Sequence, residues 1–184
     1  AKLAPLPIQF IDYTLWQKEW LQGPYAEKLE TYWRKQLAYQ EPLLALNTDF
    51  PRPEKLTYQG NSLEFTFNQS ISTAIRERCK AFNVTPNMFL MTVFYCLLFR
   101  HSGQQDITLG IPVANRQHPR VRSLIGLFVH TLIHRQIIEP NETFSQLLQR
   151  VYEQTLEIQN HLFWFYKMIS IVLSKGYICR KSKF

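Results

Sequence analysis

Segment 127–138, LFVHTLIHRQII, restricts the fold more than any other part of this 184-residue chain. It has the pattern of a β-strand with apolar residues on both faces, as expected of a strand inside a sheet. Segment 106–113, DITLGIPV, is a shorter and equally apolar strand. Such strands need helices to cover them. We therefore predict a single α/β domain, in which a mixed sheet packs against helices.

Helical periodicity and capping signals predict the other parts of that architecture. The fourth predicted helix is apolar almost all round, so we expect it to be central, and the alternating segment 61–68 predicts a half-buried strand. The predicted helices cover 6–21, 25–38, 70–82, 86–102 and 144–159. Their capping residues are Ser70 or Ser72, Thr85 with Pro86, Gly103, and Thr143 with Gln146.

The first two helices each have a predicted apolar face. That of the first helix comprises Ile8, Ile11, Leu15, Trp16 and Trp20. That of the second comprises Leu29, Tyr32, Trp33 and Leu37.

Composition excludes several classes of protein. Hydrophobic residues make up 46% and charged residues 19%, which favours a packed core over disorder. The net charge is +7, but five basic residues beyond position 161 account for most of it, and residues 1–161 carry only +2. We therefore expect no nucleic-acid binding.

Cysteine usage and the two ends of the sequence indicate the compartment. Cys79, Cys96 and Cys179 are odd in number and have no metal-ligand spacing, which favours reduced thiols in the cytoplasm. The first residues contain no secretory pattern. Segment 162–173 is apolar but too short to span a bilayer, so we expect no membrane insertion. Association of the basic tail with a membrane surface stays open as an alternative.

No pattern of catalytic or metal-ligating residues stands out. His130 and His134 share one strand face, but four residues of strand separate them by about 13 Å, so we predict no metal site. The chain has neither a nucleophile elbow nor a phosphate-binding glycine loop. His101 and Asp106 are interpreted as solvated residues of a turn.

Four motifs, in order, resemble the condensation domain of nonribosomal peptide synthetases. The first is the Asp-Tyr-x-x-Trp-Gln helix, which comprises Asp12, Tyr13, Trp16 and Gln17. The second is YWRKQLA followed by LNTDFPRP, through Tyr32, Trp33, Leu37, Thr48, Asp49, Pro51, Arg52 and Pro53. HSGQQDITLGIPVANR and IGLFVHT resemble the third and fourth. Together they cover about residues 5–160.

The resemblance implies a chloramphenicol acetyltransferase-like fold of two lobes with a tunnel between them. The family joins two acyl groups, each carried on the phosphopantetheine of a carrier domain, by an amide bond, and binds no cofactor directly. Its catalytic His-His-x-x-x-Asp-Gly motif is absent from these residues. We therefore expect no catalytic residue here, and a fragment that is inactive alone.

The resemblance also implies roles for individual residues. Lobe packing is expected of Asp12, Tyr13 and Trp16. The substrate tunnel is expected to include Asn115, Arg116, Phe128, His130 and Thr131. His130 stands where the family usually has asparagine.

Three segments are expected: the end of the first lobe with the connector (1–54), the second-lobe portion (55–161) and a divergent apolar and basic tail (162–184). Loss of resemblance after His161 suggests a frameshift or a pseudogene remnant. The expected partners are peptidyl carrier domains or other synthetase modules, and self-association through exposed apolar surface is also expected. The alternative is a non-catalytic module that binds a carrier or complements a separate first lobe.

Overall fold

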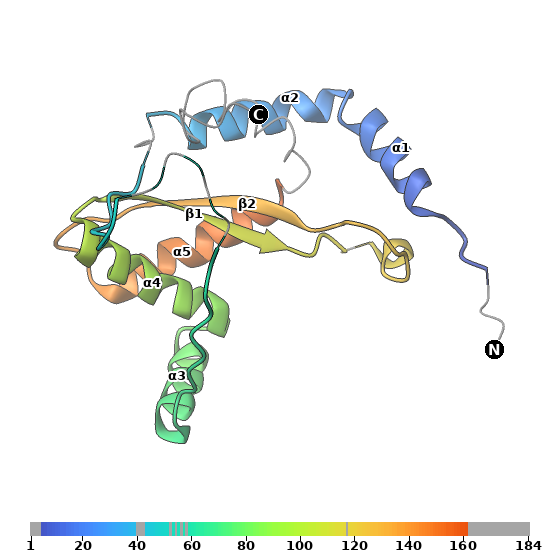
Figure 1. Cartoon of the computed structure of the whole chain (residues 1–184). Helices are drawn as coiled ribbons and strands as arrows, with labels where there is room; N and C mark the ends of the chain where they lie inside the picture. The colour runs from blue at the N-terminus through green and yellow to red at the C-terminus, as the bar shows by residue number, and fades with distance from the viewer. Residues whose placement is uncertain are drawn as a thin grey trace. The chain divides into compact units, whose positions relative to one another are not determined.

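The structure is a computed structural model that describes residues 5–39, 43–51, 53, 55, 57, 59–116 and 118–161. The predicted combination of helices with a sheet is confirmed (Figure 1). The sheet of the described residues has two strands, which are antiparallel, where a mixed sheet was predicted. In chain order the elements are α1 (Phe10–Trp20), α2 (Pro24–Gln36), α3 (Gln69–Ala81), α4 (Pro86–Ser102), β1 (Asp106–Val113), a 3₁₀ turn (Pro119–Val121), β2 (His130–Ile137) and α5 (Phe144–Gln159).

The described residues form two compact units. The first comprises 5–39, 109–116, 118–134 and 157–161. The second comprises the described positions of 43–108 together with 135–156. The predicted boundaries at 54 and 161 stay a prediction, and the tail 162–184 lies outside the described residues.

β1 and β2 are hydrogen-bonded neighbours, and β1 has the predicted bounds. Their antiparallel register is visible in two pairs: Gly110 faces Thr131, and Asp106 is bound to Arg135. On β2 one face is buried and includes both histidines, whereas Thr131 and Ile137 on the other face are exposed. Burial on both faces of β2 is therefore not observed, since its second face is only partly covered.

Most capping predictions are confirmed. The Thr85 hydroxyl accepts from the Met88 amide at 3.3 Å. Gly103 ends α4 with a φ of 70°, a left-handed conformation that glycine adopts without steric cost. Thr143 and Gln146 form the predicted capping box before α5. The Thr143 backbone amide donates to the Gln146 side-chain oxygen at 2.8 Å, and the Gln146 backbone amide donates to the Thr143 hydroxyl at 3.3 Å.

The predicted cap of α3 is wrong. Asn68 caps this helix, in place of Ser70 or Ser72, because its side-chain oxygen accepts from the Ile71 amide at 2.9 Å. An asparagine at this position satisfies one of the unpaired amides of the first turn, so the helix begins at Gln69, before both of the predicted caps.

The apolar face of α2 is confirmed, because Leu29, Trp33 and Leu37 are each at most 2% exposed. The Trp33 indole also donates to the His161 carbonyl at 3.3 Å. The predicted face of α1 is wrong: Ile11 and Leu15 are more than half exposed, and Tyr13 is the buried residue. Tyr13 is buried because it packs against Phe128, a contact that helical spacing does not reveal.

The predicted strand 61–68 is not formed. Leu63 is 90% and Phe65 74% exposed, and no strand in the described part of the chain pairs with this segment. A strand needs a hydrogen-bonded neighbour, and alternation of side chains cannot supply one.

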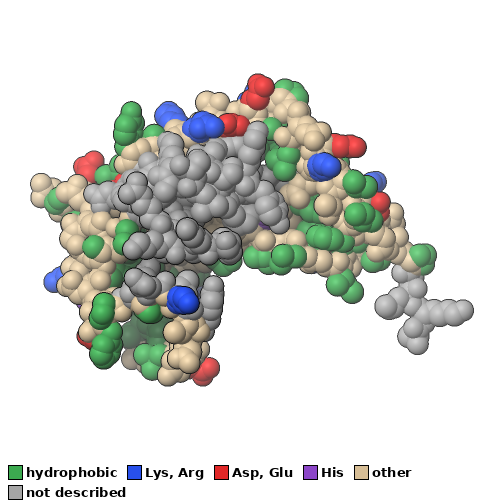
Figure 2. Space-filling model, turned by 45° about the horizontal axis from the view of Figure 1, so that its top comes forward, with side chains coloured by type: hydrophobic (Ala, Val, Ile, Leu, Met, Phe, Trp, Pro, Cys, Tyr) green, Lys and Arg blue, Asp and Glu red, His purple; other side chains and the backbone are tan. Residues whose placement is uncertain are grey.

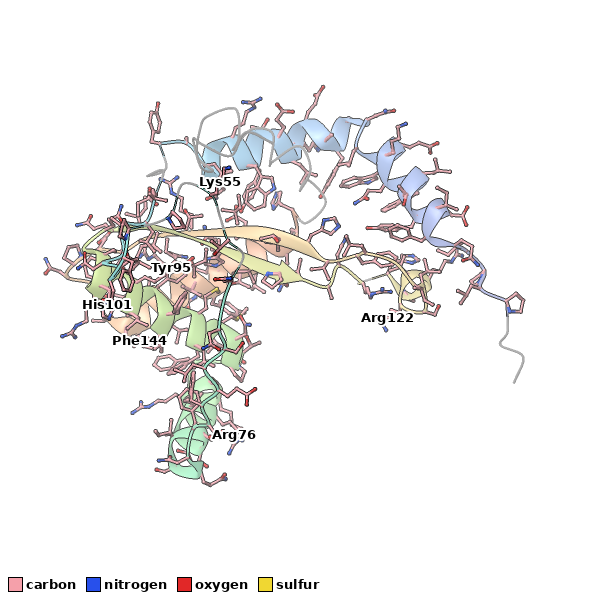
Figure 3. All side chains as sticks on the ribbon, in the orientation of Figure 1. Lys55, Arg76, Tyr95, His101, Arg122 and Phe144 are labelled. Carbon is pink, nitrogen blue, oxygen red and sulfur yellow. The ribbon has the colours of Figure 1, made fainter. Side chains whose placement is uncertain are left out.

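Helix α4 is buried along one side only. Its buried side includes Tyr95, which is fully buried and labelled in Figure 3. Its outer side has four residues that are 40–49% exposed: Leu90, Val93, Phe94 and Leu97. Hydrophobic side chains also reach the surface elsewhere, as the green atoms in Figure 2 show. The central position predicted for this helix is therefore only half realised.

Within the ranges that the structure describes, no single helix is long and apolar enough to cross a membrane. Helices α3 and α4 meet that test only as a pair, bent by 104° at the break between them. Cys79 and Cys96 are free thiols, and burial raises the pKa of both. Cys179 lies beyond the described residues.

Candidate substrate-binding site

The candidate site lies within the first unit and is built around Tyr13. Its hydroxyl accepts a hydrogen bond from the Asn115 side-chain amide at 3.0 Å. Both side chains are buried. Asn115 follows β1 with a φ of 48°, and asparagine is one of the few residues that tolerates this left-handed conformation. The backbone turn after β1 thus aims the amide at α1.

Burial raises the pKa of Tyr13, an effect larger than the opposing one of the Asn115 hydrogen bond. The phenol is therefore neutral at neutral pH. A neutral phenol that accepts one hydrogen bond keeps its own proton to donate. Tyr13 can thus position a polar atom of a bound molecule, but it cannot act as a base.

Aromatic rings pack around Tyr13. Phe128 lies with its ring centroid 4.8 Å from that of Tyr13 and 5.1 Å from that of Phe10. A side chain at Gly126 would collide with the Phe10 ring, so this position requires glycine. A glycine inside an apolar run is a sequence signal of such close approach, and it is the signal that could have predicted this cluster.

Two cavities adjoin these rings. The first has a volume of about 650 Å³, and its lining includes Asp12, Tyr13, Trp16 and Asn115. The second has a volume of about 560 Å³, and its lining includes Tyr13 and His130. Tyr13 lines both. Each cavity is within the size range of small-molecule sites.

His130 contributes a buried imidazole to the second cavity, and its burial lowers the pKa. The ring is therefore neutral at neutral pH. His134 is buried on the same strand face. Across the described ranges, no three histidine, cysteine or carboxylate side chains lie close enough to hold a metal ion.

Of the five predicted tunnel residues, three contact Tyr13 or line one of its cavities, and the other two do neither. Asn115, Phe128 and His130 each adjoin Tyr13 or one of its cavities. Arg116 binds the loop before β2 and stacks on Phe128, with its guanidinium carbon 4.2 Å from the ring centroid. Thr131 is exposed and lies against Gly110 of β1, away from these contacts.

The three residues predicted for lobe packing occupy different environments. Tyr13 is buried in the site. The Asp12 carboxylate accepts from the Gln9 amide at 2.7 Å and so caps α1. Trp16 is 47% exposed and lines the first cavity, with its ring centroid 5.8 Å from that of Tyr13. Contact with another lobe stays a prediction for all three.

In the second unit, the interpretation of Asp106 as a solvated turn residue is wrong. Its two carboxylate oxygens bind Nε and Nη2 of Arg135 at 2.7 Å each. Both side chains are at most 12% exposed. The pair joins two segments that are distant in sequence, so no local pattern indicated it.

The chain resembles known proteins over most of its length. The family model for the condensation domain matches residues 1–174. Phosphinothricin tripeptide synthetase PhsC of Streptomyces viridochromogenes is 39% identical over 157 residues, which are 85% of this chain and 14% of that protein. Malpinin synthetase of Mortierella alpina is 38% identical over 161 residues, or 88% of this chain and 2% of that one.

Solved structures share the fold. The X-domain from teicoplanin biosynthesis superposes with a TM-score of 0.85 at 22% identity, over 94% of this chain and 40% of that one. The condensation domain of the monacolin K polyketide synthase MokA superposes with a TM-score of 0.75 at 23% identity. The match covers 94% of this chain and 41% of that one. Holo-AB3403, a four-domain nonribosomal peptide synthetase, superposes with a TM-score of 0.72 at 26% identity. The match covers 74% of this chain and 10% of that one.

This chain therefore spans 2–14% of the length of the two synthetases and 10–41% of the solved chains. Its fold agrees with that of condensation domains, and the family match includes the residues that build the site around Tyr13. The chain belongs to the condensation domain family.

Proposed function

We propose that these residues form part of a condensation domain that joins two carrier-bound acyl groups by an amide bond in the cytoplasm. The match of the family model to residues 1–174 carries this proposal. The substrates would arrive on the phosphopantetheine of peptidyl carrier domains, and no cofactor would bind directly to this chain. The phosphinothricin tripeptide synthetase supports this reading, because its name describes peptide assembly.

We assign a binding role, without proton transfer, to the site around Tyr13. Its two cavities are lined partly by apolar residues, and the neutral Tyr13 hydroxyl and Asn115 amide supply fixed hydrogen bonds. Phe128 supports the Tyr13 ring, and His130 adds a neutral imidazole to the second cavity. Thr131 would contact a substrate only from the exposed strand face.

The proton-transferring histidine of the reaction would come from residues outside the 184 described by this sequence. None of the five histidines here lies in a His-His-x-x-x-Asp-Gly sequence. The purified chain, mixed with two loaded carrier domains, is therefore expected to form no amide above background. Product formation by the chain alone would overturn this part of the proposal.

A chimera tests the binding role. The 157 residues of phosphinothricin tripeptide synthetase PhsC that match this chain would be replaced by those of this chain. We expect the chimera to form amide product, and its Asn115→Ala variant to lose most of that activity. The matched control is Gln105→Ala, an exposed side chain of the second unit. A folded chimera without product would refute the amide-forming role.

We also propose that the isolated chain self-associates through exposed apolar surface. The outer side of α4 supports this, because its four partly exposed residues form a stripe at helical spacing.

A further inference from the structure

The Arg116 side chain binds several backbone carbonyls of the loop that leads to β2. One guanidinium nitrogen, Nη1, donates to the carbonyls of Val121 at 2.7 Å and Leu124 at 2.8 Å. The same nitrogen lies 3.4 Å from the Arg122 carbonyl, and Nη2 donates to the Gly126 carbonyl at 3.3 Å. Carbonyls spread over six residues thus converge on one side chain.

This loop needs such a partner. Residues 122–129 form neither helix nor strand, while the side chains of Val121, Leu124 and Phe128 are at most 5% exposed. Most other residues of 122–129 are exposed, so the two buried side chains have to be held in place by a loop that has no regular ladder of hydrogen bonds. The carbonyls of such a loop are satisfied by side chains or water. A guanidinium has five N–H groups in a fixed planar fork, so one residue can serve several carbonyls.

The 3₁₀ turn 119–121 and the loop 122–129 supply walls of the two cavities. Pro119, Arg120 and Val121 line the first cavity, and Leu127 and Val129 line the second. Arg116 is not among the lining residues of either. It also stacks on the face of Phe128, whose ring packs on Tyr13, the residue shared by both cavities. The Arg116 cation and the Phe128 ring therefore attract each other.

We propose that Arg116 is a positioning residue that sets the shape of both cavities without touching a bound molecule. It holds the loop through its carbonyls, and it holds Tyr13 through Phe128. This inference goes beyond the proposed function, because it applies to any occupant of the cavities and does not require amide formation.

The test compares Arg116→Gln and Arg116→Lys with Arg122→Gln in the full chain. Arg122 lies in the same loop, and its exposed side chain makes a matched control (Figure 3). Hydrogen exchange would be measured at the amides of Val121, Arg122 and Leu124. These amides donate to the backbone carbonyls of His118, Pro119 and Val121 respectively. Helix α5 provides the internal reference. Fluorinated Trp16, assigned through Trp16→Phe, reports on the first cavity from a lining residue of another element, α1.

Arg116→Gln is expected to accelerate exchange of the three loop amides by about ten- to a hundredfold, as loss of hydrogen bonds to a charged group predicts. The Trp16 fluorine resonance is expected to shift, while α5 and the Arg122→Gln variant stay unchanged. Arg116→Lys should behave like Arg116→Gln, because lysine keeps the charge and loses the fork. In Arg116→Ala, millimolar methylguanidinium should slow loop exchange again, and methylammonium should not.

Unchanged loop exchange and an unshifted Trp16 resonance in Arg116→Gln would overturn the proposal. Equal acceleration in α5 would also overturn it, since Arg116 would then support folding in general. Rescue by methylammonium as well as methylguanidinium would show that charge alone is needed, which contradicts the role of the fork. Failure of the chimera to form amide would leave all of these results unaffected.

Discussion

The hydrogen bond between Asn115 and Tyr13 depends on an unusual backbone conformation. The φ of 48° at Asn115 orients the side chain toward the Tyr13 hydroxyl, 102 residues earlier in the chain. Asparagine combines tolerance of that conformation with an amide donor, and neither glycine nor alanine supplies both. The residue therefore links a local turn to the packing of a distant helix.

Substitutions at Asn115 separate these two contributions. Asn115→Gly keeps the left-handed backbone and is expected to lower the free energy of unfolding by about 1 kcal/mol through the lost hydrogen bond. Asn115→Ala adds backbone strain and should cost about 1 kcal/mol more. Urea denaturation measures both, with Tyr13→Phe as the control for the hydroxyl. Equal losses for glycine and alanine would show that the backbone conformation contributes nothing.

His130 makes the stability of the fold depend on pH. Burial lowers its pKa below the usual 6.5, so just below that pH the unfolded chain binds more protons than the folded chain. The neutral, buried His130 therefore makes its full contribution to the free energy of unfolding above pH 6.5. This contribution is lost as the pH falls through the lowered pKa of the folded state.

His130→Asn removes this contribution. On acidification, the free energy of unfolding should fall more for the wild type than for the variant. Urea denaturation of both proteins between about pH 5 and 8 measures this difference. The other four histidines are common to both proteins, so subtraction of the two curves isolates His130. If the free energies of unfolding of the wild type and the variant differ by the same amount at every pH, burial of His130 does not lower its pKa.

The two strands are joined near the start of β1 and the end of β2 by the Asp106–Arg135 pair. Both of its contacts are 2.7 Å, and the side chains are only 11% and 12% exposed. A bidentate pair of this kind fixes the relative position of two strands as well as adding energy. A one-residue slip would separate the partners and reverse the faces of β2.

Asp106→Asn should lower the free energy of unfolding by about 2 kcal/mol, because it leaves the Arg135 guanidinium without its charged partner. Arg135→Lys tests the geometry, since it keeps the charge and loses the fork. We expect Arg135→Lys to lower the free energy of unfolding by about half as much as Asp106→Asn does. Chemical denaturation checks both variants. Wild-type stability in Asp106→Asn would mean that the ion pair does not hold the strands.

Association of the whole chain is expected to depend on α4. Phe94 lies in the stripe that also includes Leu90, Val93 and Leu97, and it is 46% exposed. Sedimentation velocity should show a coefficient that rises with concentration for the wild type, and Phe94→Lys should weaken that rise. Gln105→Lys adds the same charge at an exposed polar position of the same unit. A wild-type chain that stays monomeric at every concentration would refute this prediction.

Family membership follows from short motifs spread along the whole sequence, and the match to the condensation domain confirms it. The motifs also identified Tyr13, Asn115 and Phe128, which the fold brings together in one unit. The same motifs did not distinguish the side chains that line a cavity from those that do not. Thr131 and Arg116 illustrate this limit, because both lie in the motifs and neither lines the two cavities.

Local patterns were sufficient where the interaction itself is local. Thr85, Gly103 and the Thr143–Gln146 box end or begin helices through contacts three or four residues apart, so their spacing in the chain predicts them. Tertiary structure decided which side of α1 is buried, whether 61–68 pairs as a strand, and that Asp106 meets Arg135. Each of these depends on a partner distant in sequence, and periodicity describes only the side chains of the segment itself.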